Sequence, residues 1–439
     1  MKVGKYVTFM VFFSFSLIIP NVMLAQDKLL NTNRPIRSSR QLILTVGQDK
    51  GDLQGMDDKI IQAGIEYLHR LGGGILQILP GTYEMNNALY LHPNITIRGS
   101  GENTVLRKTN GMVSSITRDM DWYEYAVRVG DVTGFTTGGG IMLRSRIDSS
   151  DWAFKVFRGT IKHIQGDVLF LDNMPYNNFW VENDVSATTI FPIITAAEHT
   201  DDVIIEDIVL DGNKTQNELI NGNYAGAVFI QNCDTWKFHN VTARNYNGDG
   251  YSFQVCDDIH FENCKSLDNA GLGFHPGSGS QRPVFRNCTS TGNDLGIFFC
   301  WGVSHGIAEN CNLSDNLRYG ISIGHRDTDN LIKGCKIDNN GEVGIYFREP
   351  GGVNNFRAGN RNTIIDCEIV NNGKNKTGTG IDIGWEIEDI SIKNNRIGNT
   401  NGQDNQQTGI RISKYAKRIS HEANTFMDSP VEIEDQRLD

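Results

Sequence analysis

A repeated glycine phrase constrains the fold of this chain more than any other feature. Between Gly250 and Ile412, a glycine is followed by a bulky apolar residue, a variable residue and another bulky apolar residue. The phrase begins at Gly250, Gly271, Gly296, Gly320, Gly344, Gly380 and Gly409, at spacings of 21, 25, 24, 24, 36 and 29 residues. A period in the twenties is typical of solenoid proteins. Apolar residues at alternate positions indicate a strand with one buried face.

A second phrase ends in cysteine and recurs once in each repeat. It ends at Cys264, Cys288, Cys311, Cys335 and Cys367. Each repeat therefore holds at least two short strands separated by turns, which leaves no room for a helix. The repeats predict a parallel β-helix, in which each repeat is one coil and successive coils pair about 4.8 Å apart. The recurring cysteines predict a stack of small buried thiols, with an occasional disulfide between neighbouring coils left open.

The first 25 residues have the pattern of a secretory signal peptide. Lys2 and Lys5 precede an apolar run, Val7 to Ile19, and Ala25 provides a cleavage position. No later segment is apolar enough to span a bilayer, so we expect a secreted or periplasmic monomer without a membrane span. The net charge of the whole chain is −11, and removal of the two lysines makes it about −13. Such an acidic surface argues against nucleic acid as a partner.

An amphipathic segment precedes the repeats. The segment begins with two acidic residues, Asp57 and Asp58, and ends with Gly72, Gly73 and Gly74. Its apolar residues share one helical face; they are Ile60, Ile61, Ile65, Leu68 and Leu71. A helix at this place would cap the first coil, whose core would otherwise be exposed. We therefore expect residues 26–110 to form the cap and first coils, and residues 196–439 the main β-helix. The period breaks in residues 111–195, which predicts an inserted β-rich lobe.

The segment from Asp52 to Lys108 resembles the entry of the pectate-lyase-like superfamily. It carries the acidic helix start, the three glycines, the run Leu-Pro-Gly-Thr-Tyr and the run Ile-Arg-Gly-Ser-Gly-Glu-Asn-Thr-Val-Leu. The C-terminal repeats resemble the right-handed parallel β-helix proteins of the same group. The resemblance implies an all-β fold with a right-handed coil and a carbohydrate-active role, and it leaves the reaction open.

The alternation within each strand predicts which side chains face outward. Residues one and three after the glycine point into the coil, and residues two and four point out. Stacked coils then give an outward column of Gln231, Gln254, His275, Cys300, Gly324, Arg348, Gly384 and Ser413. A second column at the turn holds Pro276, Trp301, His325, Glu349, Trp385 and Lys414, with Arg326 and Glu386 one step further and Tyr346, Asp382 and Arg411 two residues back.

These columns form the predicted sugar site. Flat aromatic rings suit the apolar face of a sugar, and charged donors suit its oxygens or carboxylate. The alternative is a ladder of stacked aromatics and ion pairs that only stiffens the sheet. The expected catalytic residues are His275, His325, Arg348 and Glu349, and the expected substrate-binding residues are Gln231, Gln254, Trp301, Arg326, Tyr346, Asp382, Trp385 and Glu386.

Two reactions on a polysaccharide or oligosaccharide suit these residues. In a uronate-directed lyase, a base removes the proton beside the carboxyl group and a cation neutralises the developing charge. Either histidine would be the base and either arginine the cation. In an inverting hydrolase, Glu349 and Glu386 would act as acid and base. The histidines beside arginines favour the lyase, the acidic net charge weakens it, and a non-catalytic glycan-binding solenoid is the third possibility.

The sequence predicts no metal site, because it contains no Cys-x-x-Cys pair and no adjacent histidine cluster. A calcium cofactor is left open, without a clear ligand cluster. Asp249, Asp268, Asp294 and Asp315 fall in expected turns, where aspartate is common for conformational reasons.

Overall fold

The computed structural model describes residues 42–146, 154–349, 358–375 and 378–437. The expected signal peptide, residues 1–25, lies outside these ranges. Leu42 to Asp439 form one compact unit. Within the described ranges, no helix has both the length and the apolar character needed to cross a membrane.

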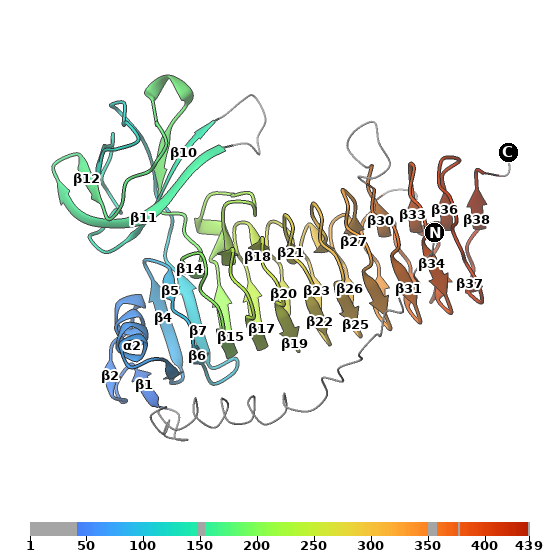
Figure 1. Cartoon of the computed structure of the whole chain (residues 1–439), viewed down its shortest axis with the longest axis horizontal. Coiled ribbons are helices and arrows are strands. Elements are labelled where there is room, and N and C mark those ends of the chain that lie inside the picture. The colour runs from blue at the N-terminus through green and yellow to red at the C-terminus, as the bar shows by residue number, and fades with distance from the viewer. Residues whose placement is uncertain (1–41, 147–153, 350–357, 376–377, 438–439) are drawn as a thin grey trace, which may run out of the picture. The chain divides into compact units, whose positions relative to one another are not determined.

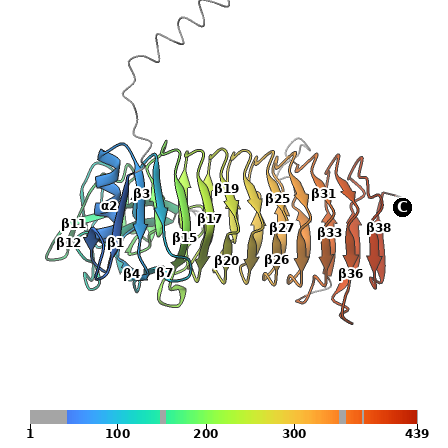
Figure 2. The same cartoon turned by 90° about the horizontal axis from the view of Figure 1, so that it is seen from below.

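The repeats form a parallel β-helix, as their period predicts, and its coils stack through main-chain pairing (Figure 1; Figure 2). One strand of each coil belongs to an eleven-stranded parallel sheet, which we call the front sheet. Its strands, in spatial as well as chain order, are β5 (Leu89–Leu91), β14 (Ile194–Ala196), β16 (Gly226–Gln231), β18 (Asp249–Gln254), β21 (Phe274–Pro276), β24 (Leu295–Phe298), β27 (Tyr319–Ile323), β30 (Val343–Phe347), β33 (Gly378–Ile383), β36 (Gln406–Ile412) and β38 (Val431–Asp435).

The other sides of the coils form a 21-stranded sheet. Its first strands are β1 (Ile43–Gly47), β2 (Leu53–Gln54), β3 (Gly74–Ile78), β4 (Gly81–Met85), β6 (Ile95–Arg98), β7 (Thr104–Lys108), β15 (Ile204–Asp211) and β17 (Lys237–Arg244). Later coils contribute two short strands each: β19 (His260–Glu262), β20 (Lys265–Leu267), β22 (Val284–Arg286), β23 (Thr289–Thr291), β25 (Ile307–Glu309), β26 (Asn312–Ser314), β28 (Leu331–Lys333), β29 (Lys336–Asp338), β31 (Thr363–Ile365), β32 (Glu368–Val370), β34 (Ser391–Lys393) and β35 (Arg396–Gly398). The last coil contributes β37 (Thr425–Met427).

In three repeats an asparagine directly precedes the cysteine of the second phrase, and it lies at the corner between the two short strands. Asn263, Asn287 and Asn310 have φ of 55°, 52° and 55°, a left-handed conformation that asparagine tolerates better than most residues. The cysteine after each corner points inward, and its thiol donates to a backbone carbonyl of the preceding coil, as from Cys264 to Phe238 at 3.4 Å. All eight cysteines are free and buried.

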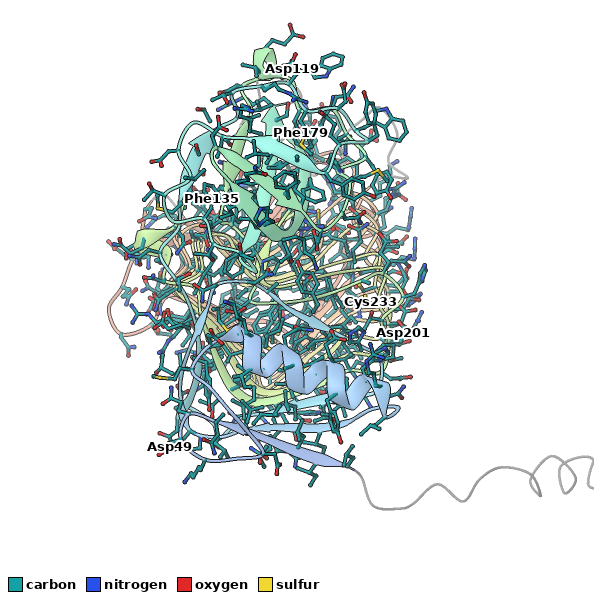
Figure 3. All side chains as sticks on the ribbon, turned by 90° about the vertical axis from the view of Figure 1, so that its left-hand side faces the viewer. Asp49, Asp119, Phe135, Phe179, Asp201 and Cys233 are labelled. Carbon is teal, nitrogen blue, oxygen red and sulfur yellow. The ribbon has the colours of Figure 1, made fainter. Side chains whose placement is uncertain are left out.

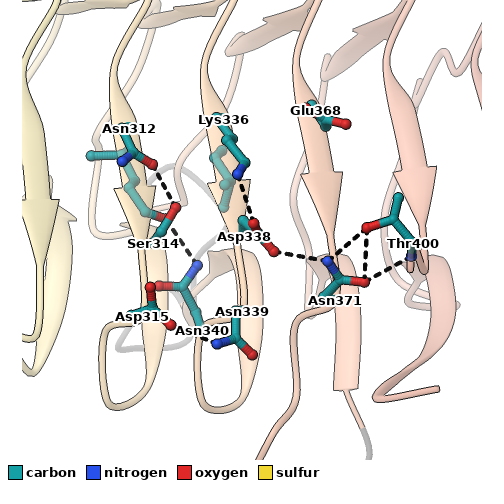
Figure 4. A network of polar contacts seen from close by, with 12 residues as sticks. Asn312, Ser314, Asp315, Lys336, Asp338, Asn339, Asn340, Glu368, Asn371 and Thr400 are labelled. Carbon is teal, nitrogen blue, oxygen red and sulfur yellow. Dashed lines mark hydrogen bonds and ion pairs between the residues drawn. The ribbon is translucent and has the colours of Figure 1, made fainter. Parts of the chain in front are cut away.

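Two kinds of contact tie neighbouring coils together besides the main chain. Inside, alternate residues of the front sheet stack, and the rings of Tyr251 and Phe274 lie 4.9 Å apart and parallel within 3°. At the turns, amides bridge one coil to the next, and Asn371 Nδ2 donates to Asp338 and to Thr400, both at 2.9 Å (Figure 4). Buried polar groups at the turns are thereby satisfied, which a stack of short strands requires.

The expected capping helix is present as α2 (Asp58–Arg70). The Asp57 side chain accepts from the Lys59 backbone N–H at 3.2 Å and so caps its N-terminus. Its apolar face, with Ile61, Ile65 and Leu68, is fully buried in the same core as the first coils. This helix closes the end of the stack, as the sequence predicts.

Between β7 and β14 the chain forms a separate six-stranded antiparallel sheet, within the segment expected to be a β-rich lobe. Its strands are β8 (Val113–Ser115), β9 (Ala126–Arg128), β10 (Gly140–Arg146), β11 (Phe154–Gln165), β12 (Val168–Leu171) and β13 (Ser186–Thr188). This lobe has its own apolar core, which includes Phe135 and Phe179 (Figure 3). Two short 3-10 helices, η1 (Val181–Asn183) and η2 (Lys214–Gln216), lie in connections.

One coil has a different register from the sequence prediction. Tyr251 pairs with Phe274, which aligns Gly250 with Gly273 and not with Gly271. The prediction was wrong by two residues here, because the run Gly-Leu-Gly-Phe offers the glycine phrase in two registers. A slip of two residues leaves the inward and outward assignment unchanged, since the side-chain period of a strand is two.

The slip changes the neighbours of one predicted catalytic residue. His275 pairs with Ser252, so it belongs to the outward column that continues through Phe298 and Ser322. It therefore does not lie in the column of Gln254, where it was expected. Gly277 takes that place, and the Gln254 side chain lies over it.

Candidate functional site

A cavity of about 1010 Å³ lies on the outward face of the front sheet. Its floor consists of side chains from β16, β18, β21, β24 and the turn after β24, and its wall includes Arg144 of the lobe and the loop 219–223. Four of the predicted site residues line this cavity: Gln231, Gln254, His275 and Trp301. The other predicted site residues, which are His325, Arg326, Tyr346, Arg348, Glu349, Asp382, Trp385 and Glu386, follow on later coils and do not line it.

A buried histidine–aspartate pair lies at the floor of this cavity. His275 Nδ1 and Asp249 Oδ2 are 2.7 Å apart, and both side chains are almost fully buried. The other carboxylate oxygen of Asp249 accepts the Leu272 backbone N–H at 2.8 Å. The main chain of the next coil therefore holds Asp249, and Asp249 in turn fixes the orientation of the imidazole.

The pair raises the pKa of His275. Burial alone lowers this pKa, since it disfavours the charged ring, but the hydrogen bond to Asp249 and the neighbouring Cys300 outweigh burial and raise it to about 9. At neutral pH the ring is thus an imidazolium. Its Nε2 has no hydrogen-bond partner of normal geometry among the described residues. The residue lines the cavity, and its Nε2 atom is buried just beneath the cavity surface.

The raised pKa predicts a pH-dependent contribution to stability. The folded-state pKa of His275 lies above its unfolded value, so the contribution is complete below about pH 6.5 and is lost as pH rises through about 9. The full loss is on the order of 3 kcal/mol. We expect the free energy of unfolding, measured in urea at about pH 6 and about pH 10, to fall more in the natural protein than in His275→Gln. Equal falls in the two proteins would contradict the pairing.

Arg348, a predicted catalytic cation, is engaged within the fold. Its guanidinium donates to Ser322 Oγ at 2.7 Å, to the Phe299 carbonyl at 2.7 Å and to the buried Asp327 carboxylate at 3.0 Å. It also lies 4.2 Å from the centre of the Phe298 ring. These contacts give Arg348 a structural role. Its guanidinium is a positive charge near the cavity, but it is not freely available to bind a substrate.

The turn column forms an exposed strip beyond the cavity. The rings of Trp301 and His325 are 5.2 Å apart, and Trp301 and Trp385 are 55% and 44% exposed. Glu349, Glu386 and Arg326 are exposed on the same turns. Trp301 and Trp385 have φ of 64° and 61°, a conformation that is strained for side chains of this size. A ladder that only stiffens the sheet does not explain why aromatic residues on this strip are both strained and exposed.

The remaining predicted residues have partners within the sheet. Burial raises the pKa of Asp382, and Arg411, 3.2 Å away, counteracts that effect. Tyr346 packs on Tyr319 with ring centres 4.8 Å apart. Gln231 donates to Glu198 at 2.9 Å, and the Gln254 side-chain oxygen accepts the Ser278 backbone N–H at 3.0 Å.

Asp249 was not among the predicted site residues. The prediction that it has an ordinary role in a turn was wrong, because Asp249 begins β18 and is buried against His275. The sequence signal was a pair of positions on adjacent coils. Asp249 directly precedes the repeated glycine Gly250, and His275 follows the aligned glycine of the next coil, Gly273, by two residues. That signal is readable only once the register is known. Asp294 and Arg318, paired at the cavity edge at 2.7 Å, were missed for the same reason.

Comparisons with known proteins support the fold. Residues 226–357 match the family described as "Right handed beta helix region". The chain is similar to the A-module of the mannuronan C-5 epimerase AlgE4 of Azotobacter vinelandii, with 14% identity, coverage of 88% of this chain and 98% of that one, and a TM-score of 0.51. The AlgE6 A-module of the same organism is similar at 14% identity, with 85% and 93% coverage and a TM-score of 0.49. The fold is thus a right-handed parallel β-helix, as predicted.

One curated relative is similar in sequence. It is the capsule K1-specific depolymerase of Klebsiella phage K64-1, 24% identical over 280 residues, which cover 54% of this chain. The chain spans only 30% of the length of that relative.

Proposed function

We propose that this protein is an exported enzyme that cleaves an acidic polysaccharide by β-elimination at a uronate residue. The observation that carries the proposal is the His275–Asp249 pair, an imidazolium and a carboxylate 2.7 Å apart that are buried at the floor of an open cavity and line it. The relative described as a capsule depolymerase supports a polysaccharide as substrate. A uronate supplies the negative charge that this imidazolium would attract.

His275 would act as a proton donor in this reaction. Elimination transfers the C5 hydrogen of the uronate as a proton to a base, and the charge that develops on its carboxylate is stabilised by a cation. The bond from C4 to its glycosidic oxygen then breaks, and the leaving oxygen takes a proton. An imidazolium held by Asp249 supplies both the charge and that proton. This differs from the base role that the sequence analysis considered for the histidines.

The test is ultraviolet absorbance during incubation with a panel of uronate polymers. Elimination creates a double bond conjugated with the carboxylate, whereas hydrolysis does not. We expect absorbance to rise with the natural protein and not with His275→Gln, which keeps a polar side chain but no transferable charge. New reducing ends without absorbance would show hydrolysis, and binding without either product would show a glycan-binding protein.

A substitution in the exposed strip is expected to weaken substrate binding without destabilising the fold. Trp301→Asn is expected to raise KM about tenfold, the equivalent of about 1.4 kcal/mol, because a flat apolar surface for a sugar is lost. The same change is expected to stabilise the fold by up to about 1 kcal/mol, since asparagine tolerates the φ of 64°. Val255→Asn is the matched stability control, because its φ is 54° and it carries no ring. An unchanged KM would remove the strip from the substrate site.

The inverting hydrolase remains the second candidate. Glu349 and Glu386 are both exposed on neighbouring coils of the strip, where a carboxylate pair has access to a bound chain. Glu349→Gln separates the candidates: it abolishes hydrolysis if Glu349 is the acid or base, and it leaves elimination at the His275 cavity in place.

A further inference from the structure

Four aromatic side chains are exposed together on the antiparallel lobe. Trp122, Tyr123, Tyr176 and Trp180 are 52%, 56%, 62% and 40% exposed, and all four lie outside the apolar core of the lobe and outside the lining of the large cavity. We call these four residues the lobe cluster. Large aromatic residues gathered on the surface of a folded domain mark a binding surface, whereas single ones need no explanation.

One carboxylate holds the lobe cluster together. The Trp180 indole N–H donates to Asp121 Oδ1 at 3.2 Å, and the Tyr123 hydroxyl donates to Asp121 Oδ2 at 3.3 Å. The rings of Trp122 and Tyr123 lie 5.7 Å apart, edge to face. The Tyr176 backbone N–H donates to the Trp122 carbonyl at 3.2 Å. Rings held in this way lose little conformational entropy when a ligand binds.

The lobe backbone directs this cluster outward. Met120 and Phe179 form a bridge through backbone hydrogen bonds of 3.1 and 2.9 Å, and both side chains are buried in the lobe core. Since side chains alternate along extended chain, the next residues, Asp121 and Trp180, face outward. Figure 3 shows Asp119 at the end of the lobe, beyond Phe179. Packing of the lobe interior therefore does not account for the Trp180 ring.

Two further observations indicate a ligand site here. A hollow of about 530 Å³ lies against the Trp180 ring, and Asp119, Val181 and Glu182 complete its lining. Tyr176 has a φ of 54°, a left-handed conformation that is unfavourable for a bulky side chain. Because Tyr176 is exposed, packing does not compensate for this strain, and strained residues of this kind gather at functional sites.

The chemistry of the lobe cluster fits a glycan better than a protein. The core of a protein interface is depleted of charged residues, whereas carboxylates of Asp119, Asp121 and Glu182 lie among these rings. An aromatic ring takes the apolar face of a sugar, and the hydroxyls at the sugar edge donate to carboxylates. The neighbouring Arg118 is paired with Glu124. A uronate would bring its own carboxylate against like charges, which disfavours it.

We propose that the lobe cluster is a second glycan-binding surface, specific for neutral or amino sugars, that binds its ligand without cleaving it. Sugars without a carboxylate cannot undergo the elimination proposed for the His275 cavity. This surface is therefore distinct from the proposed reaction, and either can be disproved without the other. Its role would be to hold the protein on a glycan, while the cavity over the front sheet acts on uronate residues.

Calorimetric titration of the natural protein and of a Trp122→Ala, Trp180→Ala double variant tests the proposal. The probes are short β-(1→4)-linked oligosaccharides of glucose, glucosamine or glucuronate, which differ only in charge and share one backbone. Mannose and galactose oligosaccharides extend the neutral set to other configurations. We expect a neutral or amino probe to bind the natural protein and to lose affinity at least about tenfold in the double variant. The Kd of the glucuronate probe should stay within about twofold.

The matched control is Tyr67→Ala, which removes a 54% exposed ring from α2. It should bind the same probe as tightly as the natural protein. Binding of no neutral or amino probe, or equal binding by the double variant, overturns the proposal. An equal loss of affinity for glucuronate overturns its charge selectivity.

Hydroxyl-radical footprinting of the natural protein tests the same surface without a variant. The bound neutral or amino probe should protect Trp122 and Trp180 from oxidation, since a sugar stacked on a ring covers its face. Tyr67 should be oxidised equally with and without the probe. Unchanged oxidation of both tryptophans at a saturating probe concentration would place the ligand elsewhere and overturn the proposal.

Discussion

Asp249→Asn is expected to lower kcat about 10³-fold. The substitution keeps the shape of the side chain but removes the charge that holds His275 as an imidazolium. The pKa of His275 should then fall below its ordinary value, because burial alone disfavours the charged ring. Initial rates of absorbance measure the first effect, and titration of the imidazole resonances by NMR measures the second.

The matched control is Asp268→Asn. Asp268 is exposed, lies in a turn with φ of 53° and has a conformation that asparagine tolerates. We expect its kcat to match that of the natural protein. Retention of activity in Asp249→Asn together with an unchanged pKa of His275 would show that the pair is structural only.

Asp327→Ala is expected to destabilise the fold by about 3–5 kcal/mol. The Asp327 carboxylate is fully buried and accepts the backbone N–H groups of Gly302, Val303 and Gly324 at 2.9, 3.0 and 2.7 Å, besides Arg348. Its removal leaves three backbone donors without an acceptor and the Arg348 guanidinium without a counter-charge, which costs more than the lost contacts alone. Urea unfolding at neutral pH measures the loss.

The double variant Asp327→Ala with Arg348→Met is the control for this second prediction. It removes the charge that would otherwise be left unpaired, so part of the stability is expected to return. A loss below about 1 kcal/mol in the single variant, the size expected for an exposed ion pair, would contradict the structural role of Arg348. It would return Arg348 to the group of candidate substrate ligands.

Features set by neighbouring residues were predictable from the sequence, and contacts between distant residues were not. The cap helix was predictable because its signals, Asp57 at the start and apolar residues at helical spacing, all lie within one short segment. The outward direction of Trp301 and Arg348 was predictable because alternation is local to a strand. The partner of His275 was not, because Asp249 lies 26 residues earlier in the chain and was read as one more aspartate in a turn.

The sequence by itself determined that this chain coils, where a cap closes the coil and which side chains leave its interior, since periods of two and of about two dozen residues are written in neighbouring positions. Only the tertiary structure decided which outward groups meet. Contacts between coils depend on the register of main-chain pairing, and a slip of two residues changes every neighbour without changing any alternation. That is why Asp249, His275 and Cys300 come together only in the folded chain.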